Sequence, residues 1–107
     1  MPYTFSRCIC IETPDQREAV QFYTEVLGLP VRADNDKSVE FDASSIRLFV
    51  DRQDRSLVIF EFLVPDVEAA REELLAKGCT VVRWEGAGRC CYMKDPFGLV
   101  FNLYQMK

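Results

Sequence analysis

SRCICIETPD, residues 6–15, is an alternating strand that runs into a Thr-Pro-Asp turn, and LVIFEFLVPD, residues 57–66, repeats this pattern about fifty residues later. Each stretch leads into a helical pattern that ends in glycine, at Gly28 in the first half and at Gly78 in the second. Three short apolar segments separated by turn residues follow each helical pattern. The sequence therefore predicts two copies of one βαβββ unit, as an ancestral duplication would produce.

The repeat also predicts where the elements begin and end. Strands are expected over residues 6–12, 31–33, 38–42 and 45–51, and again over 57–64, 79–85, 90–94 and 99–104. Thr13 is expected to cap the first helix, with Pro14 at the first helical position and Gln16 completing a capping box, while Asp66 caps the second helix. The apolar stripes of the two helices are expected to bury Ala19, Phe22, Tyr23, Val26, Leu27, Val67, Ala70, Leu74 and Leu75.

Length and composition set the outer limits. The 107 residues are enough for one domain, which we expect to span 1–107 with repeats at 4–52 and 56–105. A net charge of −4, with 13 basic residues scattered among 17 acidic ones, argues against nucleic acid as a partner. No apolar run is long enough to span a membrane, and residues 1–4 do not begin a signal peptide. Five cysteines without framework spacing favour reduced thiols, so a cytoplasmic protein is expected.

Charge decides which strand faces point toward the helices. Ile46, Leu48 and Val50 are placed under a helix, because the alternative would bury Arg47 and Asp51 there. The same reasoning places under the helices Ile9, Ile11, Val58, Phe60, Phe62, Val64, Leu99, Phe101 and Leu103. The face that points away from the helices is called the open face below. It is expected to carry Cys8, Cys10, Glu12, Arg47, Phe49, Leu57, Ile59, Glu61, Leu63, Tyr92, Val100, Asn102 and Tyr104.

A sheet with such a mixed second face curls around a ligand, meets another chain, or does both. We therefore predict a small-molecule cavity lined from the open face, with Trp84 lining it or packing at its edge. The candidate ligand-binding residues are Cys8, Cys10, Glu12, Arg47, Phe49, Ile59, Glu61, Trp84, Tyr92, Asn102 and Tyr104.

Three phrases carry a resemblance to a known family. Residues 22–29, FYTEVLGL, resemble the end of the first helix of the vicinal oxygen chelate superfamily, which includes glyoxalase I, bleomycin-resistance proteins and extradiol dioxygenases. Residues 64–70 and 74–78 resemble its second helix, and Asp95-Pro96-Phe97-Gly98 resembles its last turn. The resemblance implies an α+β fold in which two βαβββ repeats form a cupped mixed sheet. It also implies a homodimer, since members of this superfamily often complete the cup by pairing units from two chains.

The resemblance also implies where a metal would bind. In the metal-dependent members, His and Glu from four strands hold a divalent cation, and these positions fall here on Cys8, Phe49, Ile59 and Asn102. Phenylalanine and isoleucine offer no donor atom, so no metal and no other cofactor is expected. Cys8 and Cys10 share a strand face with Glu12 and would be the basis of an atypical soft-metal site.

Catalytic residues are not assigned. The chain has no histidine, so a catalytic thiol would depend on Arg47, Arg89 or a lysine. Two functional classes remain open. The favoured one is a metal-independent homodimer that binds an aromatic or antibiotic-like molecule, as the bleomycin-resistance branch does by sequestration. The rival is an enzyme of lyase, isomerase or oxygenase type, using Glu12 or Glu61 as a base or the Cys8 and Cys10 site. A plainer alternative is an open face that serves only to pair with another chain.

Overall fold

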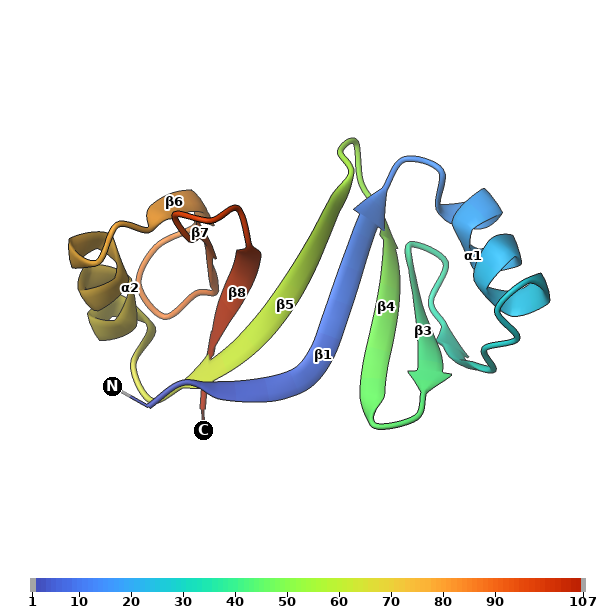
Figure 1. Cartoon of the computed structure of the whole chain (residues 1–107), viewed down its shortest axis with the longest axis horizontal. Coiled ribbons are helices and arrows are strands. Elements are labelled where there is room, and N and C mark those ends of the chain that lie inside the picture. The colour runs from blue at the N-terminus through green and yellow to red at the C-terminus, as the bar shows by residue number, and fades with distance from the viewer. Residues whose placement is uncertain (1, 107) are drawn as a thin grey trace. The chain divides into compact units, whose positions relative to one another are not determined.

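The elements follow the order that the repeat predicts, with one helix and four strands in each half of the chain (Figure 1). The computed structural model describes residues 2–106. Contacts divide the chain into two compact units. The first unit comprises Arg7–Val58, and the second comprises Ile59 onward together with the residues that lead up to Ser6. The predicted α+β class with two βαβββ repeats is confirmed.

The first unit contains one parallel and two antiparallel strand pairs. Its elements are β1 (Thr4–Thr13), α1 (Gln16–Glu25), β2 (Val31–Asp34), β3 (Ser38–Ala43) and β4 (Ile46–Arg52). The strand order is β2-β3-β4-β1, in which β1 runs parallel to β4 and the other pairs are antiparallel. The helix α1 packs against β4.

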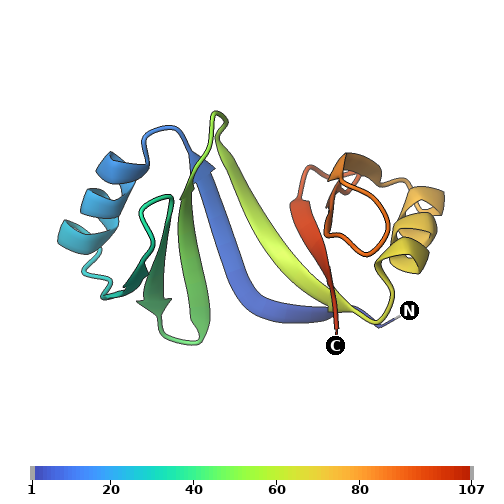
Figure 2. The same cartoon turned by 180° about the vertical axis from the view of Figure 1, so that it is seen from behind.

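The second unit repeats this topology. Its elements are β5 (Leu57–Val64), α2 (Val67–Ala76), β6 (Thr80–Trp84), β7 (Cys91–Lys94) and β8 (Val100–Gln105). The order is β5-β8-β7-β6, with β5 parallel to β8, and α2 packs against the last three strands. Figure 2 shows from behind that each helix lies beside the strands of its own unit. Neither helix within the described residues is long and apolar enough to cross a membrane.

The start of α1 differs from the prediction. Asp15 occupies the N-cap position, and the Thr13 hydroxyl accepts a hydrogen bond from the Asp15 amide instead of capping the helix. Gln16, the expected capping-box partner, is buried, and its Nε2 donates to the Val50 carbonyl at 3.0 Å. The prediction of a capping box is therefore wrong, because the Gln16 side chain donates to a carbonyl of β4 and the N-cap lies two residues later than predicted.

Both ends of α2 match the prediction. The Asp66 carboxylate accepts from the Ala69 amide, which is an ordinary N-cap bond. At the other end the Cys79 amide donates to the Leu74 carbonyl and the Gly78 amide to the Leu75 carbonyl. These two bonds form a Schellman motif, and Gly78 adopts the positive φ of 99° that the motif requires.

Each unit has its own core between helix and strands. In the second unit the buried cluster is Val64, Val67, Ala70, Cys79, Cys91, Met93, Phe101 and Leu103. In the first unit Val39, Phe41 and Val50 are fully buried, and Ala19, Val20, Tyr23, Leu29 and Leu48 pack against them. The predicted helix-side residues Leu48, Val50, Phe60, Phe62, Val64, Phe101 and Leu103 all contribute to these cores.

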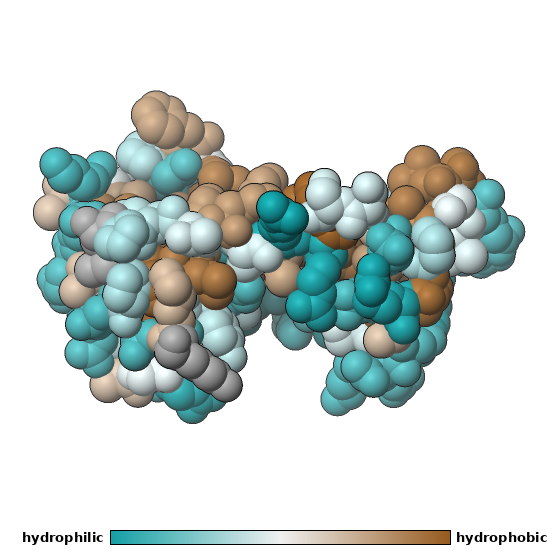
Figure 3. All heavy atoms as spheres, turned by 90° about the horizontal axis from the view of Figure 1, so that it is seen from below, coloured by the Kyte–Doolittle hydropathy of each residue, from teal (hydrophilic) through white to brown (hydrophobic). Residues whose placement is uncertain are grey.

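Several residues predicted to be buried are exposed. On α1 the buried stripe is Gln16, Ala19, Val20 and Tyr23, so Phe22 and Val26 fall beside it, and Leu27 lies beyond the helix end. All three are about half exposed or more, and Figure 3 shows apolar residues on the surface at the end of the molecule that carries α1. On α2 the buried residues are Val67 and Ala70, and Leu75 is exposed beside them. The predictions for Val58 and Leu99 are also wrong, since both are exposed: Val58 lies in the part of β5 that belongs to the first unit, and Leu99 lies in the turn before β8.

Candidate functional site

The open face of the second unit carries a row of polar side chains across all four strands. Glu61 of β5 pairs with Asn102 of β8, Asn102 with Tyr92 of β7, and Tyr92 with Arg83 of β6. Residues that are directly paired share one sheet face, and the neighbouring pairs on the other face belong to the helix-side core. The structure therefore brings three predicted site residues together and adds Arg83 to them.

Asn102 is the most constrained member of this row. It is 7% exposed, and its Nδ2 donates to Glu61 Oε2 at 3.4 Å, which is a long hydrogen bond. Its Oδ1 is buried and has no hydrogen-bond partner among the described residues. Buried carbonyl oxygens are almost always paired, so this atom remains available to accept a hydrogen bond from a ligand or from water. Ile59 and Val100, the next pair along β5 and β8, provide a buried apolar floor beside it.

The open face of the first unit is more strongly charged. Cys8 pairs with Arg47, Cys10 with Phe49 and Glu12 with Asp51, which places all the predicted site residues of β1 and β4 on this face. The Arg47 guanidinium lies 5.2 Å from the centre of the Phe49 ring. It also binds the buried carboxylate of Glu40 in bidentate fashion, at 2.8 Å from Nε and 3.1 Å from Nη2.

These ion pairs hold the carboxylates in place. The hydrogen bond from Arg47 lowers the pKa of Glu40 below its ordinary value, although burial acts in the opposite direction. Glu12, one of the two candidate bases, has a side chain that is 4% exposed and lies 2.7 Å from Arg55 Nε. A proton-abstracting role for Glu12 would therefore require this ion pair to break first.

Trp84 lies on the opposite face from the one expected. It pairs with the buried Cys91 and packs against the helix-side core, where the Arg71 guanidinium stacks 4.1 Å from its ring centre. The cause is an irregularity in β6 between Val81 and Arg83, which adds a residue to that strand. A bulge of this kind reverses the alternation, so Trp84 turns inward and Arg83 outward.

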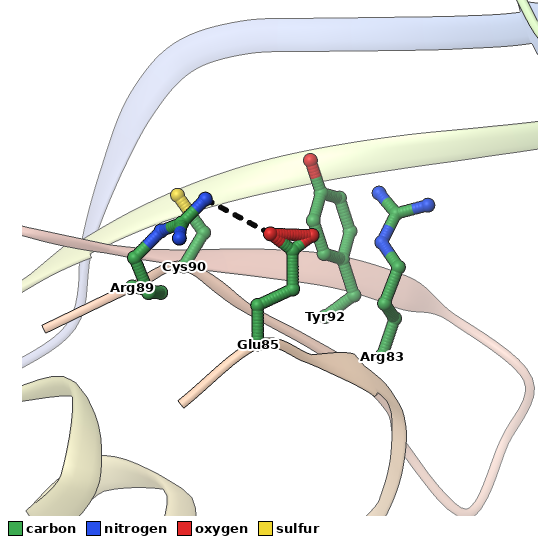
Figure 4. Close-up of a pocket in the computed structure, with 5 residues that line it drawn as sticks. All are labelled: Arg83, Glu85, Arg89, Cys90 and Tyr92. Atoms are coloured by element: carbon green, nitrogen blue, oxygen red, sulfur yellow. Dashed lines mark hydrogen bonds and ion pairs between the residues drawn. The ribbon is translucent and has the colours of Figure 1, made fainter. Parts of the chain in front are cut away.

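A small cavity opens where Arg83 emerges. It has a volume of about 230 Å³ and is lined by Arg83, Glu85, Arg89, Cys90 and Tyr92 (Figure 4). The Arg83 guanidinium lies 4.1 Å from the centre of the Tyr92 ring, and Arg89 pairs with Glu85 at 2.9 Å. A second hollow of about 450 Å³ adjoins it, shares Arg89 and Cys90, and is also lined by Tyr104, the last of the predicted site residues.

Sequence reasoning missed Arg83 and Glu85 as site residues. It considered Arg89 only as a positive charge that could activate a catalytic thiol. The usable signal was the concentration of charge on either side of Gly86-Ala87-Gly88, in a loop that joins two strands.

The thiols divide into two groups. None of the five cysteines is in a disulfide, and burial raises the pKa of the Cys79 and Cys91 thiols. These two belong to the helix-side core and are poor nucleophiles there. Cys8, Cys10 and Cys90 are half-buried.

Comparison with known proteins settles the family. A family model described as glyoxalase-like domain matches residues 8–104. The chain belongs to the glyoxalase-like domain family. A comparison with curated protein sequences finds no match.

Solved structures share this glyoxalase-like fold at low sequence identity. A Mn(II)-bound glyoxalase from Novosphingobium aromaticivorans is 20% identical, with a TM-score of 0.62 over 97% of this chain and 40% of that one. A glyoxalase/bleomycin resistance protein/dioxygenase superfamily member from Vibrio splendidus 12B01 is 16% identical, with a TM-score of 0.61 over 92% of this chain and 97% of that one.

A third structure is homoprotocatechuate 2,3-dioxygenase from Brevibacterium fuscum in a substrate complex. It is 16% identical, with a TM-score of 0.66 over 98% of this chain and 37% of that one. The chain thus spans well under half the length of this dioxygenase and of the Novosphingobium glyoxalase, and the likeness to all three structures shows the fold.

The positions where the superfamily resemblance places metal ligands do not fit a divalent cation. Cys8, Phe49, Ile59 and Asn102 stand at them, and only the thiol and the amide carry donor atoms. The Asn102 Nδ2 is directed at Glu61, and Ile59 is 3% exposed. Among residues 2–106 no three or more His, Cys, Asp or Glu side chains form a group that would hold a metal, which also leaves the Cys8 and Cys10 alternative without a third ligand.

Proposed function

We propose that this glyoxalase-like protein binds a small organic molecule, aromatic or antibiotic-like, without a metal. The observation that carries the proposal is that Phe49 and Ile59 stand at two of the four positions where the superfamily resemblance places metal ligands. Phe49 lies half-buried on the open face of the first unit, where it offers apolar contact area, and Ile59 is part of the buried apolar floor of the second unit.

Polar groups in each unit support ligand binding. In the second unit the carbonyl oxygen of Asn102, next to Ile59 and Val100, has no partner among residues 2–106. In the first unit the Arg47 guanidinium lies 5.2 Å from the centre of the Phe49 ring while it holds Glu40. Ligand sites are typically apolar with a few fixed polar groups that set orientation, and this arrangement matches that description.

Catalysis is the less favoured alternative. Of the two candidate bases, Glu12 is held in an ion pair by Arg55. Glu61 accepts only a long hydrogen bond from Asn102 among the contacts described above, so it is the better candidate. An enzyme that uses Glu61 as its base would lose turnover in a Glu61→Gln variant and keep its affinity for substrate.

We further propose that the protein is a cytoplasmic homodimer. Cysteines outside disulfides suit a reducing compartment, and the exposed apolar residues of the first unit, among them Phe22, Val26 and Leu27, offer surface for pairing. Sedimentation or light scattering would measure a mass of twice one chain, whereas a monomer over the whole accessible concentration range would refute the dimer.

A binding screen tests the proposed function. Protein treated with a chelator is screened by thermal shift against neutral, acidic and basic aromatic compounds, and hits are titrated by calorimetry. The Phe49→Ala variant should weaken binding several-fold, whereas Phe97→Ala, which removes a 92% exposed ring from a turn, should not. If no compound stabilises the protein, or if Phe97→Ala weakens binding as much as Phe49→Ala, the proposal fails.

A further inference from the structure

The connection between β6 and β7 concentrates positive charge in an otherwise acidic chain. Arg83 and Arg89 line the cavity of about 230 Å³ with one opposing carboxylate, Glu85, although the whole protein carries a net charge of −4. In Figure 4 their side chains project in one direction, and Glu85 lies between Arg89 and the pair formed by Tyr92 and Arg83. The local charge therefore favours an anion.

Arg83 lies over the ring of Tyr92. The central carbon of its guanidinium is 4.1 Å from the ring centre, which is a cation–π contact, and the N–H donors of that group lie in its own plane. Arginine presents these donors as a planar fork that matches the two oxygens of a carboxylate. The contact with Tyr92 thus holds the guanidinium at the cavity, where an incoming carboxylate would meet it.

Glu85 shows that a carboxylate is accepted in this position. Its Oε1 lies 2.9 Å from Arg89 Nη2, and the two side chains are 56% and 63% exposed. Exposed ion pairs of this kind contribute little to stability, so a ligand carboxylate would replace Glu85 beside Arg89 at small cost.

The cavity suits the head group of a ligand and leaves the body of the ligand outside. Pockets for whole small molecules occupy roughly 300–1,000 Å³, more than this cavity provides. The adjoining hollow of about 450 Å³ shares Arg89 and Cys90 and is lined further on by Tyr104 and Met106. Tyr92 also belongs to the polar row that contains Asn102, which connects the cavity to the open face of the second unit.

We propose that Arg83 and Arg89, together with the Tyr92 hydroxyl, bind the carboxylate of a small organic acid whose apolar or aromatic part lies over Tyr104 and Met106. This inference rests on the proposed ligand-binding function and names the chemical class of its ligand. Glu85 competes with the ligand for Arg89.

Matched pairs of acids and amides test the inference. Benzoate, 3-phenylpropionate and indole-3-acetate are titrated by calorimetry against the whole chain, each beside its neutral amide, with sulfate and phosphate as inorganic anions. Each organic acid should bind at least about tenfold more tightly than its amide and than either inorganic anion, the effect expected when one charge-assisted contact is lost.

Variants with opposite expected signs make the test specific. Arg83→Gln and Arg89→Gln should each weaken acid binding about tenfold, and Arg83→Lys should recover part of the loss. Glu85→Gln should strengthen acid binding, because the competing carboxylate is gone. Lys77→Gln, which removes a positive charge at the end of α2, is the control and should leave the affinity unchanged.

A chemical readout does not depend on calorimetry. Half-buried Cys90 lines both hollows, so a bound acid should slow its alkylation, as followed by peptide mass spectrometry, without slowing that of Cys8. Equal affinity for acid and amide, an equal loss in Lys77→Gln, weaker binding in Glu85→Gln, or unprotected Cys90 would each overturn the inference.

The two proposals fail in different ways. If neutral amides bind as tightly as the acids, and this binding is weakened by Phe49→Ala but not by Arg83→Gln, the carboxylate inference is overturned and the proposed function stands. If neither acids nor neutral compounds bind, both are overturned.

Discussion

Replacing Arg47 by methionine would test the charge network on the open face of the first unit. The Glu40 side chain is 9% exposed and takes two hydrogen bonds from Arg47, at 2.8 and 3.1 Å. Methionine keeps the apolar stem but removes the charge. Breaking a buried ion pair costs about 3–5 kcal/mol, whereas an exposed pair contributes about 0–1 kcal/mol.

The ion pair between Arg47 and Glu40 is neither fully buried nor fully exposed, so its contribution should fall between these two ranges. Arg47 is 58% exposed, and Arg32 remains 3.5 Å from the same carboxylate oxygen. We therefore expect the Arg47→Met variant to lose about 2 kcal/mol of unfolding free energy, which corresponds to roughly 10 °C in Tm for a domain of this size.

Urea denaturation followed by circular dichroism would measure the loss. Arg52→Met, at the exposed end of the same strand, is the control and should change stability by less than about 0.5 kcal/mol. A double-mutant cycle with Glu40→Gln should give a favourable coupling of about 1 kcal/mol or more.

The dependence on pH adds a second test. The pKa of Glu40 is lower in the folded protein than in the unfolded chain, so the folded state binds fewer protons and the ion pair contributes fully at neutral pH. That contribution is lost as the pH falls below the ordinary glutamate range and through the lowered pKa. The stability gap between wild type and Arg47→Met should therefore shrink in acid. A gap below about 0.5 kcal/mol at neutral pH, or one that stays constant in acid, would refute the reasoning.

Three further substitutions test the fold. Gly78→Ala should lower stability by about 1–2 kcal/mol in thermal melts, because φ is +99° and the added Cβ would lie 3.3 Å from Pro96 Cγ; an unchanged Tm would contradict the Schellman cap. Leu103→Ala should cost about 3 kcal/mol in urea, because the fully buried side chain would leave a cavity, and a loss below about 1 kcal/mol would place Leu103 outside the core. Asp66→Ala should cost about 1 kcal/mol but Asp15→Ala less than half of that, since among the described residues only Asp66 of these two makes a side-chain cap bond; equal losses would contradict the capping difference.

The order of helices and strands could be predicted from the sequence because the repeat supplied two independent readings of each element. Strand alternation also placed Cys8, Cys10, Phe49, Ile59, Glu61 and Asn102 on the open face, and the strand register confirms that placement. The reason is elementary: burying Arg47 and Asp51 under a helix would have cost more than any alternative arrangement.

The residues that sequence reasoning misplaced in β6 and α1 share one physical cause, a local displacement of the regular pattern. The irregularity in β6 exchanged the faces of Arg83 and Trp84, and nothing in the composition of residues 79–85 marks it. On α1, burial of the polar Gln16 rotated the helix so that Gln16, Ala19, Val20 and Tyr23 face the sheet and Phe22 does not. Alternation and helical spacing describe regular elements, so a single added or displaced residue is enough to exchange inside and outside.

Metal retained per chain is the measurement that tests the central claim most directly. Purified protein is incubated separately with manganese(II), zinc, nickel and iron(II), dialysed, and analysed for metal, with a Cys8→Ala variant in parallel. Because Phe49 and Ile59 stand at two positions where the superfamily resemblance places metal ligands, we predict no stoichiometric metal in either protein. One metal ion per chain that disappears in Cys8→Ala would contradict the account and return the protein to the metal-dependent members of its superfamily.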